Sequence, residues 1–197
     1  MIINKDKEWF VACLKNEPLV ESLKKIKLVI SDIDGCLTDG KVSYDGNNHE
    51  IQKDFSVQDG YMINQCVTKD LLKIALVTGR IDKAARKRAE VLGVPKKFYY
   101  EGVDSDKSSA VEKIMSTLDI NKEEVIFFGD DFLDLQTKDS VGMLVSPTNA
   151  MFYIHSNSEI VVPRSGGNGA LRLLIDLILY IQNKHFAQEF IKDSINQ

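Results

Sequence analysis

The chain has 197 residues, with 25 basic and 29 acidic side chains and a formal net charge of −4. That balance excludes a broad basic surface of the kind that binds nucleic acids or anionic membranes. The longest apolar stretch, residues 171–181, carries Arg172 and Asp176 and is too short to cross a bilayer. The length therefore fits one globular domain with a sizeable core, and we expect no nucleic-acid or membrane partner.

The two ends of the chain differ from its middle. Residues 1–25 are polar with spaced apolar positions such as Trp9 and Phe10, which predicts an N-terminal extension of one or two short helices. Residues 26–184 form the predicted single domain, and the polar tail at 185–197 is expected to fray. The three cysteines lack metal-ligand spacing, so we expect reduced thiols in a cytoplasmic protein.

The stretch at 26–35 joins an apolar, β-branched run to two aspartates and a glycine. Such a run predicts a strand buried on both faces of a parallel sheet, and ligands bind beyond the carboxyl ends of such strands. Asp32 and Asp34 lie on the same side of the chain because a strand has a period of two. Two adjacent carboxylates repel, which favours a hard divalent cation such as Mg²⁺ beside them. The alternative is a plain strand-to-turn junction, since Asp-Gly pairs are common in turns.

Residues 40–55 predict a β-hairpin. Two short strands, at 41–44 and 49–55, flank a glycine- and asparagine-rich turn. A doubly wound fold passes from its first strand directly into a helix, so the hairpin is an insertion at the rim of the expected site. It can act as a flap or as a contact between subunits, and His49 is expected to be a surface residue of the hairpin.

After the hairpin, apolar strands alternate with helical segments. Further strands are predicted at 73–78, 98–100, 125–128, 141–145 and 160–162. Helices are predicted to start at 59, 106, 147 and 170, and a further helix between the strands at 73–78 and 98–100 is predicted to end at 92. Ser105 or Asp104 is the expected cap of the helix at 106–118, and the last helix is expected to reach about residue 184. The alternation predicts a three-layer α/β/α architecture with a doubly wound, mostly parallel, Rossmann-like sheet and a β-hairpin insertion after the first strand.

Polar side chains follow four of the predicted strands, and each set has a use in phosphoryl transfer. Asp32 is the candidate nucleophile, because a carboxylate can attack phosphorus and form an aspartyl-phosphate. Asp34 can protonate the leaving oxygen and then deprotonate water. Thr78 can donate its hydroxyl and its backbone N–H to phosphate oxygens, and Lys107 can place a positive charge against the phosphoryl group.

A cation completes the predicted constellation. Asp130, with Asp32 and the backbone carbonyl of Asp34, can hold Mg²⁺. Asp131 and Asp134 are expected to support these ligands. Taken alone, several of these residues have structural alternatives: Thr78 as a strand residue, Lys107 as a solvated helix lysine and Asp131 as a helix N-cap. Their joint occurrence on successive strand ends favours the catalytic interpretation.

These motifs resemble those of the haloacid dehalogenase superfamily of phosphatases, and of its cap-less branch in particular. The four motifs match Asp32-Ile33-Asp34-Gly35, Thr78 in Val77-Thr78-Gly79-Arg80, Lys107, and Gly129-Asp130-Asp131-Phe132-Leu133-Asp134. The resemblance runs from about residue 28 to residue 184 and includes the hairpin. It implies a Mg²⁺-dependent phosphomonoesterase that is a homotetramer, in which a neighbouring subunit completes the active site.

The resemblance also implies a substrate, 3-deoxy-D-manno-octulosonate 8-phosphate, which is hydrolysed to the free sugar acid for lipopolysaccharide synthesis. By the same matching, Arg80 and Arg88 are expected to bind the sugar-acid carboxylate, since guanidinium forks suit a planar carboxylate. The other substrate-binding residues that it implies are Ser56, Val57, Gln58, Asp59, Gly60, Asn64 and Gly79.

The chain departs from the family pattern at four positions. The family often has a basic residue at the position of Asn64 and a glycine at that of Met62. It commonly has an arginine where this chain has Asn168 and a glutamate where it has Leu173. These departures keep open the related nine-carbon substrate, 2-keto-3-deoxy-nononate 9-phosphate. Enzymes for that substrate tend to carry an acidic residue at the Arg80 position, so Arg80 favours the eight-carbon acid.

An alternative of another class is a non-catalytic oligomerisation module, similar to domains that are fused to nucleotide-sugar synthetases. A module of that kind is free to lose the residues that only catalysis requires. Asp34 and Lys107 are both present here, which favours an enzyme.

Overall fold

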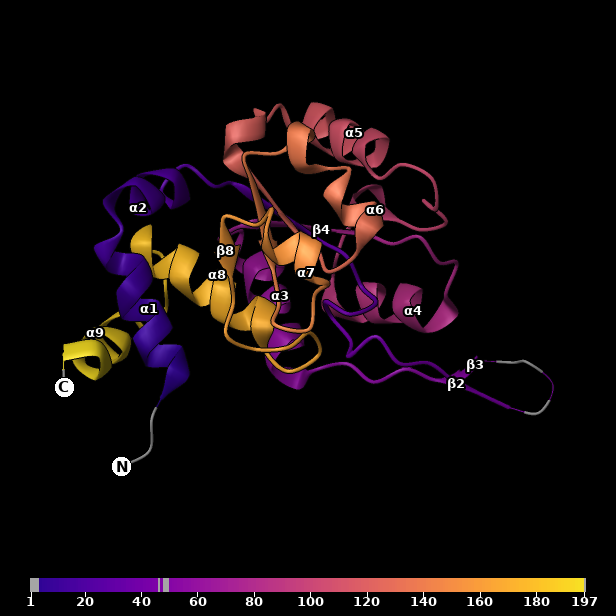
Figure 1. Ribbon diagram of the computed structural model, residues 1–197, viewed down its shortest axis with the longest axis horizontal. Helices are drawn as coiled ribbons and strands as arrows, with labels where there is room; N and C mark the ends of the chain where they lie inside the picture. The colour runs from indigo at the N-terminus through magenta and orange to yellow at the C-terminus, as the bar shows by residue number, and fades with distance from the viewer. Residues whose placement is uncertain (1–3, 46, 48–49, 197) are drawn as a thin grey trace.

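A parallel six-stranded sheet forms the centre of the protein. The computed structural model describes residues 4–45, 47 and 50–196 (Figure 1). The strands of this sheet are β1 (Leu28–Ser31), β4 (Lys73–Val77), β5 (Tyr99–Tyr100), β6 (Val125–Phe128), β7 (Met143–Ser146) and β8 (Ile160–Val161). Their order in the sheet is β5-β4-β1-β6-β7-β8, and every neighbouring pair is parallel. The predicted doubly wound α/β architecture is confirmed.

The two central strands form because their sequences are apolar except for Ser31 at the end of β1. All four residues of β1 and all four of β6 are buried, so both faces of these strands lie under helices. Phe127 and Phe128 are fully buried and are among the largest such side chains. Strands that are covered on both faces have continuous apolar sequences. The positions of these two strands could therefore be predicted from the sequence.

Nine α-helices occur among the described residues. They are α1 (Lys5–Lys15), α2 (Glu17–Leu23), α3 (Val57–Lys69), α4 (Lys83–Leu92), α5 (Ser108–Leu118), α6 (Phe132–Leu135), α7 (Phe152–His155), α8 (Ala170–Ile181) and α9 (Gln188–Asn196), with short 3₁₀ helices at Lys96–Phe98, Lys122–Glu124 and Lys138–Ser140. In the view of Figure 1, α5 and α6 lie above the sheet and α3, α4 and α8 lie below it. The three layers predicted from the sequence are therefore present.

Several helix boundaries differ from the prediction. Helix α3 begins at Val57, two residues early, because Ser56 caps it. The expected caps Asp104 and Ser105 are wrong, since α5 begins at Ser108, whose N–H donates to the Asp106 side chain. The stretch at 147–150 forms a turn instead of a helix, and α7 begins only at Phe152.

The C-terminal tail is a second correction. Helix α8 ends at Ile181, and the tail beyond it folds into α9 instead of fraying. His185 is buried, and its Nε2 lies 2.8 Å from Oδ1 of Asp176. Ile191 and Ile195 of α9 pack against the core. Figure 1 shows α1, α2 and α9 together at the end of the molecule opposite the hairpin.

The predicted hairpin forms a separate two-stranded sheet. Strands β2 (Ser43–Tyr44) and β3 (Glu50–Gln52) pair in antiparallel fashion and extend as an arm from the body of the molecule (Figure 1). Both strands are shorter than predicted. The prediction for His49 lies outside the described residues.

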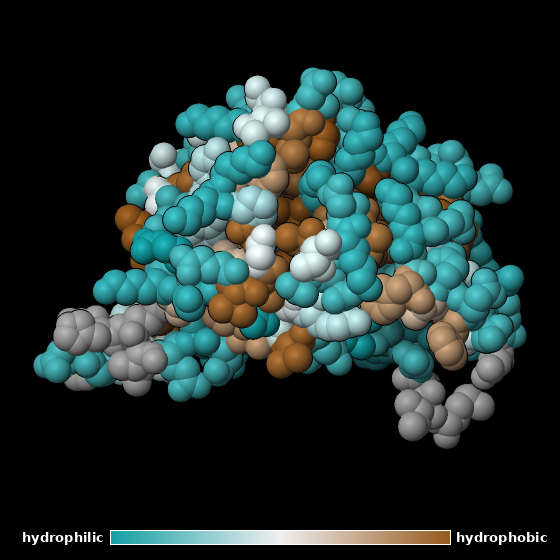
Figure 2. Space-filling view, turned by 180° about the vertical axis from the view of Figure 1, so that it is seen from behind, coloured by the Kyte–Doolittle hydropathy of each residue, from teal (hydrophilic) through white to brown (hydrophobic). Residues whose placement is uncertain are grey.

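Polar side chains cover most of the surface seen in Figure 2, and apolar ones come to the surface between them near the middle of that face. Among the described residues, no helix combines the length and the apolar character that a membrane crossing needs.

Candidate active site

The carboxyl ends of the parallel strands meet in one pocket with a volume of about 320 Å³. Its wall is formed by Asp32 and Asp34 after β1, Thr78, Gly79 and Arg80 after β4, Lys107 before α5, and residues 130–134 after β6. All the predicted catalytic and metal-ligating residues lie in this wall. They come together because parallel strands place their carboxyl ends at one edge of the sheet.

The loop after β1 turns sharply into the site. The N–H of Asp32 still donates to the carbonyl of Phe128 at 2.9 Å, which continues the sheet by one residue. Gly35 then takes a φ of 88°, a conformation that side chains disfavour. A Cβ there would lie 2.0 Å from the Asp130 carboxylate. Glycine at this position thus permits both the turn and the close approach of two acidic loops.

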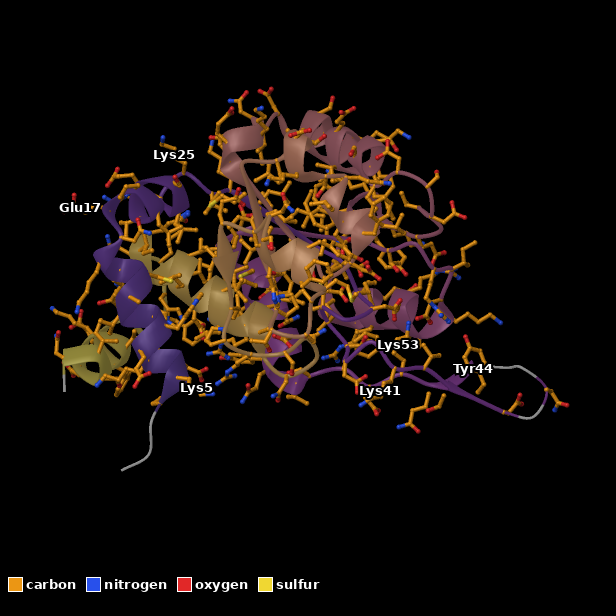
Figure 3. The ribbon with its side chains drawn as sticks, viewed as in Figure 1. Lys5, Glu17, Lys25, Lys41, Tyr44 and Lys53 are labelled. Atoms are coloured by element: carbon orange, nitrogen blue, oxygen red, sulfur yellow. The ribbon has the colours of Figure 1, made fainter. Side chains whose placement is uncertain are left out.

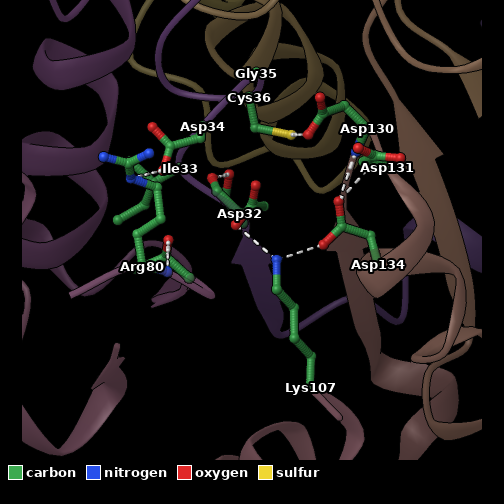
Figure 4. A network of polar contacts seen from close by, with 12 residues as sticks. Asp32, Ile33, Asp34, Gly35, Cys36, Arg80, Lys107, Asp130, Asp131 and Asp134 are labelled. Carbon is green, nitrogen blue, oxygen red and sulfur yellow. Dashed lines mark hydrogen bonds and ion pairs between the residues drawn. The ribbon is translucent and has the colours of Figure 1, made fainter. Parts of the chain in front are cut away.

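Lys107 bridges two carboxylates at the base of the pocket (Figure 4). Its Nζ donates to Oδ1 of Asp32 at 2.7 Å and to Oδ1 of Asp134 at 2.6 Å, and all three side chains are buried. Burial opposes the charge on Lys107, but the two carboxylates outweigh it and raise the pKa of its ammonium. The other oxygen of Asp134 accepts the N–H groups of Asp130 and Asp131 at 2.8 and 3.1 Å. Asp134 therefore fixes both the lysine and the loop after β6.

The pocket holds more negative charge than Lys107 can balance. Burial and the charge of Asp134 raise the pKa of Asp32 to about 7. Burial and the charges of Asp32 and Asp134 raise the pKa of Asp130 to about 8. Oxygens of Asp32 and Asp130 lie within 4.8 Å of one another, together with the Cys36 sulfur. Two crowded carboxylates of this kind fit a hard divalent cation.

Cys36 is a neighbour of this acidic pair that the sequence did not indicate. Its Sγ lies 3.5 Å from the carbonyl of Phe128 and 3.6 Å from Oδ1 of Asp130 (Figure 4). Burial, followed by the charges of the nearby aspartates, raises the pKa of the thiol well above its usual range. Cys36 is therefore a neutral thiol that donates weakly to Asp130.

We expect a divalent cation to stabilise the protein more at alkaline than at acidic pH. Because the pKa of Asp130 is raised from 3.8 to about 8, the metal-free folded state loses stability as the pH rises through that range. A cation offsets the resulting repulsion, and protons compete with it at low pH. Mg²⁺ should therefore raise the melting temperature more at about pH 8.5 than at about pH 5.5.

Thermal unfolding with MgCl₂ or with EDTA at the two pH values measures this difference. Asp130→Asn serves as the control and should remove most of the Mg²⁺-dependent increase. An equal increase at both pH values, or one that persists in the variant, would contradict the placement of the cation between these carboxylates.

Thr78 corrects one detail of the sequence analysis. Its backbone N–H donates to the carbonyl of Tyr100 at 2.9 Å, so it cannot donate to a phosphate as expected. The pairing of β4 with β5 causes this, because it extends one residue past β4. The hydroxyl oxygen accepts the N–H of Arg80 at 3.3 Å, and the hydroxyl hydrogen can still donate to a phosphate oxygen.

Among the described residues of the hairpin, two contact side chains of the pocket wall, and neither contact was predicted from the sequence. The Tyr44 hydroxyl accepts a hydrogen bond from Nη2 of Arg80 at 3.0 Å. Lys53 lies between Asp34 and Asp82, with its Nζ 2.6 Å from Oδ1 of Asp34. The arm thus contacts two residues of the pocket wall, Arg80 and Asp34, within a single chain.

Asp131 follows the alternative interpretation as a helix cap. Its side chain accepts the N–H of Phe132 at the start of α6 and the hydroxyl hydrogen of Tyr153 at 2.6 Å. Asn149 has a comparable structural role that the sequence did not indicate. It donates to the Gly35 carbonyl at 2.8 Å and accepts the N–H of Gly166 at 2.6 Å, so it ties the loop after β1 to the loop before α8.

Most of the other expected substrate-binding residues lie outside this pocket. Asp59 is buried and accepts the N–H groups of Gly169 and Arg172 at the start of α8. Arg88 donates to the Ser56 carbonyl at 3.3 Å. Asn64 donates to a backbone carbonyl on α4. The assignment of Arg88, Asn64 and residues 56–60 to substrate binding stays a prediction.

A family model described as haloacid dehalogenase-like hydrolase matches residues 102–174. The curated 3-deoxy-D-manno-octulosonate 8-phosphate phosphatase of Yersinia pestis is 36% identical over 168 residues, which cover 85% of this chain and 87% of that protein. The chain is therefore similar to this enzyme over most of both lengths.

Solved structures of phosphatases with the same named substrate are also similar to this chain over most of both lengths. The phosphatase of that name from Moraxella catarrhalis, crystallised with a magnesium ion, a phosphate ion and a KDO molecule, has a TM-score of 0.79 and 30% identity. The match covers 91% of this chain and 98% of that one. The cobalt-bound deoxy-D-mannose-octulosonate 8-phosphate phosphatase of Haemophilus influenzae has a TM-score of 0.78 and 33% identity, over 86% of this chain and 99% of that one.

Proposed function

The chain belongs to the haloacid dehalogenase-like hydrolase family, and from this we propose that it hydrolyses 3-deoxy-D-manno-octulosonate 8-phosphate to the free sugar acid and phosphate. The observation that carries the proposal is the arrangement of Asp32, Asp34, Lys107 and Asp130 in one pocket, with Arg80 at its rim. The relatives named above, which act on this substrate by their names, support the same choice.

In the mechanism that we propose, each residue has a step. Asp32 attacks phosphorus, the bond from phosphorus to the sugar oxygen breaks, and Asp34 gives that oxygen a proton. Asp34 then takes a proton from water, which attacks the aspartyl-phosphate, releases phosphate and restores Asp32. Lys107, 2.7 Å from Asp32, keeps the nucleophile oriented and places a positive charge beside the phosphoryl oxygens.

Mg²⁺ fits the acidic pair at the pocket base. Asp32 and Asp130 would hold it with the backbone carbonyl of Asp34, and the ion would neutralise charge on the phosphoryl group. The raised pKa values of both carboxylates support this position. Relatives whose structures contain magnesium or cobalt support a divalent cation.

Arg80 is the side chain that we assign to the sugar-acid carboxylate. Its side chain is 43% exposed, and the Tyr44 hydroxyl holds one end of its guanidinium. A positive charge at this rim suits an acid and favours the eight-carbon substrate over an analogue whose enzymes carry an acidic residue here. Guanidinium groups bind carboxylates through two parallel hydrogen bonds.

We expect Arg80→Met to lower kcat/KM about 10- to 100-fold for the sugar-acid phosphate, the effect of losing one charge-assisted hydrogen bond. An aryl phosphate without a carboxylate should be hydrolysed as before. Arg86→Met is the matched control, because Arg86 is equally exposed and pairs with Glu101. Equal losses on both substrates would show that Arg80 does not recognise the carboxylate.

The assembly that we propose is a cytoplasmic homotetramer in lipopolysaccharide synthesis, with a neighbouring subunit closing each pocket. Large apolar side chains near the pocket support a covered surface, because Ile81 is 77% and Phe132 is 59% exposed in the single chain. Sedimentation equilibrium measures the mass of the assembly, and a monomer would contradict this part of the proposal.

A further inference from the structure

We propose that Lys53, at the base of the hairpin, is a positioning residue that fixes which oxygen of the Asp34 carboxyl group faces the substrate pocket. Lys53 follows β3, and its side chain is wholly buried. Figure 3 shows it where the hairpin arm joins the body of the molecule, whereas Tyr44 lies farther out on the arm.

The two oxygens of Asp34 have different surroundings. Oδ1 is buried and lies 2.6 Å from Nζ of Lys53, as an ion pair without the alignment of a hydrogen bond. The side chain as a whole keeps 22% of its surface exposed and lines the pocket. Oδ2 lies toward Arg80, 3.9 Å from its Nε (Figure 4). While Lys53 occupies Oδ1, Oδ2 is the oxygen available to a substrate.

Asp82 holds the other side of the Lys53 ammonium. This carboxylate is also buried, and its Oδ1 caps α4 by accepting the N–H groups of Ala84 and Ala85 at 2.7 and 3.2 Å. Its Oδ2 contacts Lys53. The lysine therefore sits between the anchored carboxylate of Asp82 and the carboxylate of Asp34, and it connects the hairpin, the loop after β1 and the start of α4. A supporting group fixed in this way orients the residue that it contacts.

The consequence depends on the proposed function, because it concerns the proton that Asp34 gives to the leaving oxygen. A sugar oxygen leaves as a strongly basic alkoxide and needs that proton as its bond to phosphorus breaks. A nitrophenolate is a weak base and leaves without one. A displaced Asp34 should therefore slow alkyl phosphates selectively. A lysine that served only to anchor the hairpin would affect both kinds of substrate alike.

The experiment compares kcat/KM for the sugar-acid phosphate and for p-nitrophenyl phosphate in Lys53→Met. The value of kcat/KM for each substrate reports the steps up to the first phosphoryl transfer, which include the proton donation. We expect a loss of about 100-fold on the sugar-acid phosphate and less than about 3-fold on the aryl phosphate. Lys53→Arg, which keeps the charge, should recover part of the loss. The matched control is Lys41→Met, at a hairpin lysine that is 85% exposed and pairs with Asp39, and it should change neither value.

A double variant tests whether Lys53 acts through Asp34. Adding Lys53→Met to Asp34→Asn should cause no further loss, because residues that act as a unit are not additive. Equal losses on both substrates, or additive losses in the double variant, would overturn the inference. Lys53→Gln gives the same comparison if the methionine variant does not fold. A wild-type protein that hydrolyses no phosphate would overturn the proposed function itself, whereas an active wild type with parallel losses would overturn only the role of Lys53.

Discussion

Asp32→Asn is expected to lower turnover of every phosphate ester by at least about 10⁴-fold, because it replaces the carboxylate that attacks phosphorus with a non-nucleophilic amide. The loss should be the same for alkyl and aryl phosphates, since both pass through the same aspartyl-phosphate. The measurement is phosphate release under substrate saturation, with Mg²⁺ present.

The same variant should fold without loss of stability. Burial and then the charge of Asp134 raise the pKa of Asp32 to about 7. Removing the charge of Asp32 relieves repulsion with Asp130 and Asp134, so the melting temperature of the metal-free variant should equal or exceed that of the wild type at neutral pH. An inactive variant that is also unfolded would leave the loss attributable to structure, whereas turnover near the wild-type value would reject Asp32 as the nucleophile.

Lys107→Met should affect both stability and activity. It leaves Asp32 and Asp134 buried without the cation that they share at 2.7 and 2.6 Å. Breaking a buried ion pair by removing one partner costs about 3–5 kcal/mol of unfolding free energy. Separately from this loss of stability, the loss of a positive charge beside the phosphoryl group should lower kcat about 10²- to 10³-fold relative to the wild type. This is approximately the effect of removing one transition-state donor.

Chemical denaturation and phosphate release measure the two effects separately. Lys113→Met on the exposed side of α5 is the matched control and should stay within about 0.5 kcal/mol of the wild type. The loss of stability should be smaller at acidic pH, where the carboxylates of Asp32 and Asp134, left without Lys107, become protonated. A variant as stable as the wild type at neutral pH would contradict the description of Lys107 as their shared counter-charge.

The sequence was most informative where one physical rule acts locally. Strands β1 and β6 are buried on both faces, so their apolar runs could be recognised directly. The acidic and basic residues after the strands could be assigned to one site because parallel strands gather their carboxyl ends. Asp32, Asp34, Lys107 and Asp130 lie in one pocket for that reason.

The sequence was least informative where a contact depends on register or on distant segments. The N–H of Thr78 is occupied because β5 pairs one residue beyond β4, and the sequence does not specify that register. Lys53 meets Asp82 across 29 positions, through a hairpin whose direction only the folded chain defines. His185 is buried against Asp176 after the chain reverses beyond α8, so the polar tail folds into a helix that composition alone did not indicate.

The most direct test of the proposed function is the kcat/KM of the wild-type protein for 3-deoxy-D-manno-octulosonate 8-phosphate with Mg²⁺, measured beside the nine-carbon analogue and an aryl phosphate. We expect the eight-carbon substrate to be preferred by at least about 10-fold over either, because Arg80 and the pocket bind its transition state best. Preference for another phosphate would retain the mechanism and reject the substrate. No release from any ester, in a folded protein that binds Mg²⁺, would contradict the function and favour a non-catalytic module.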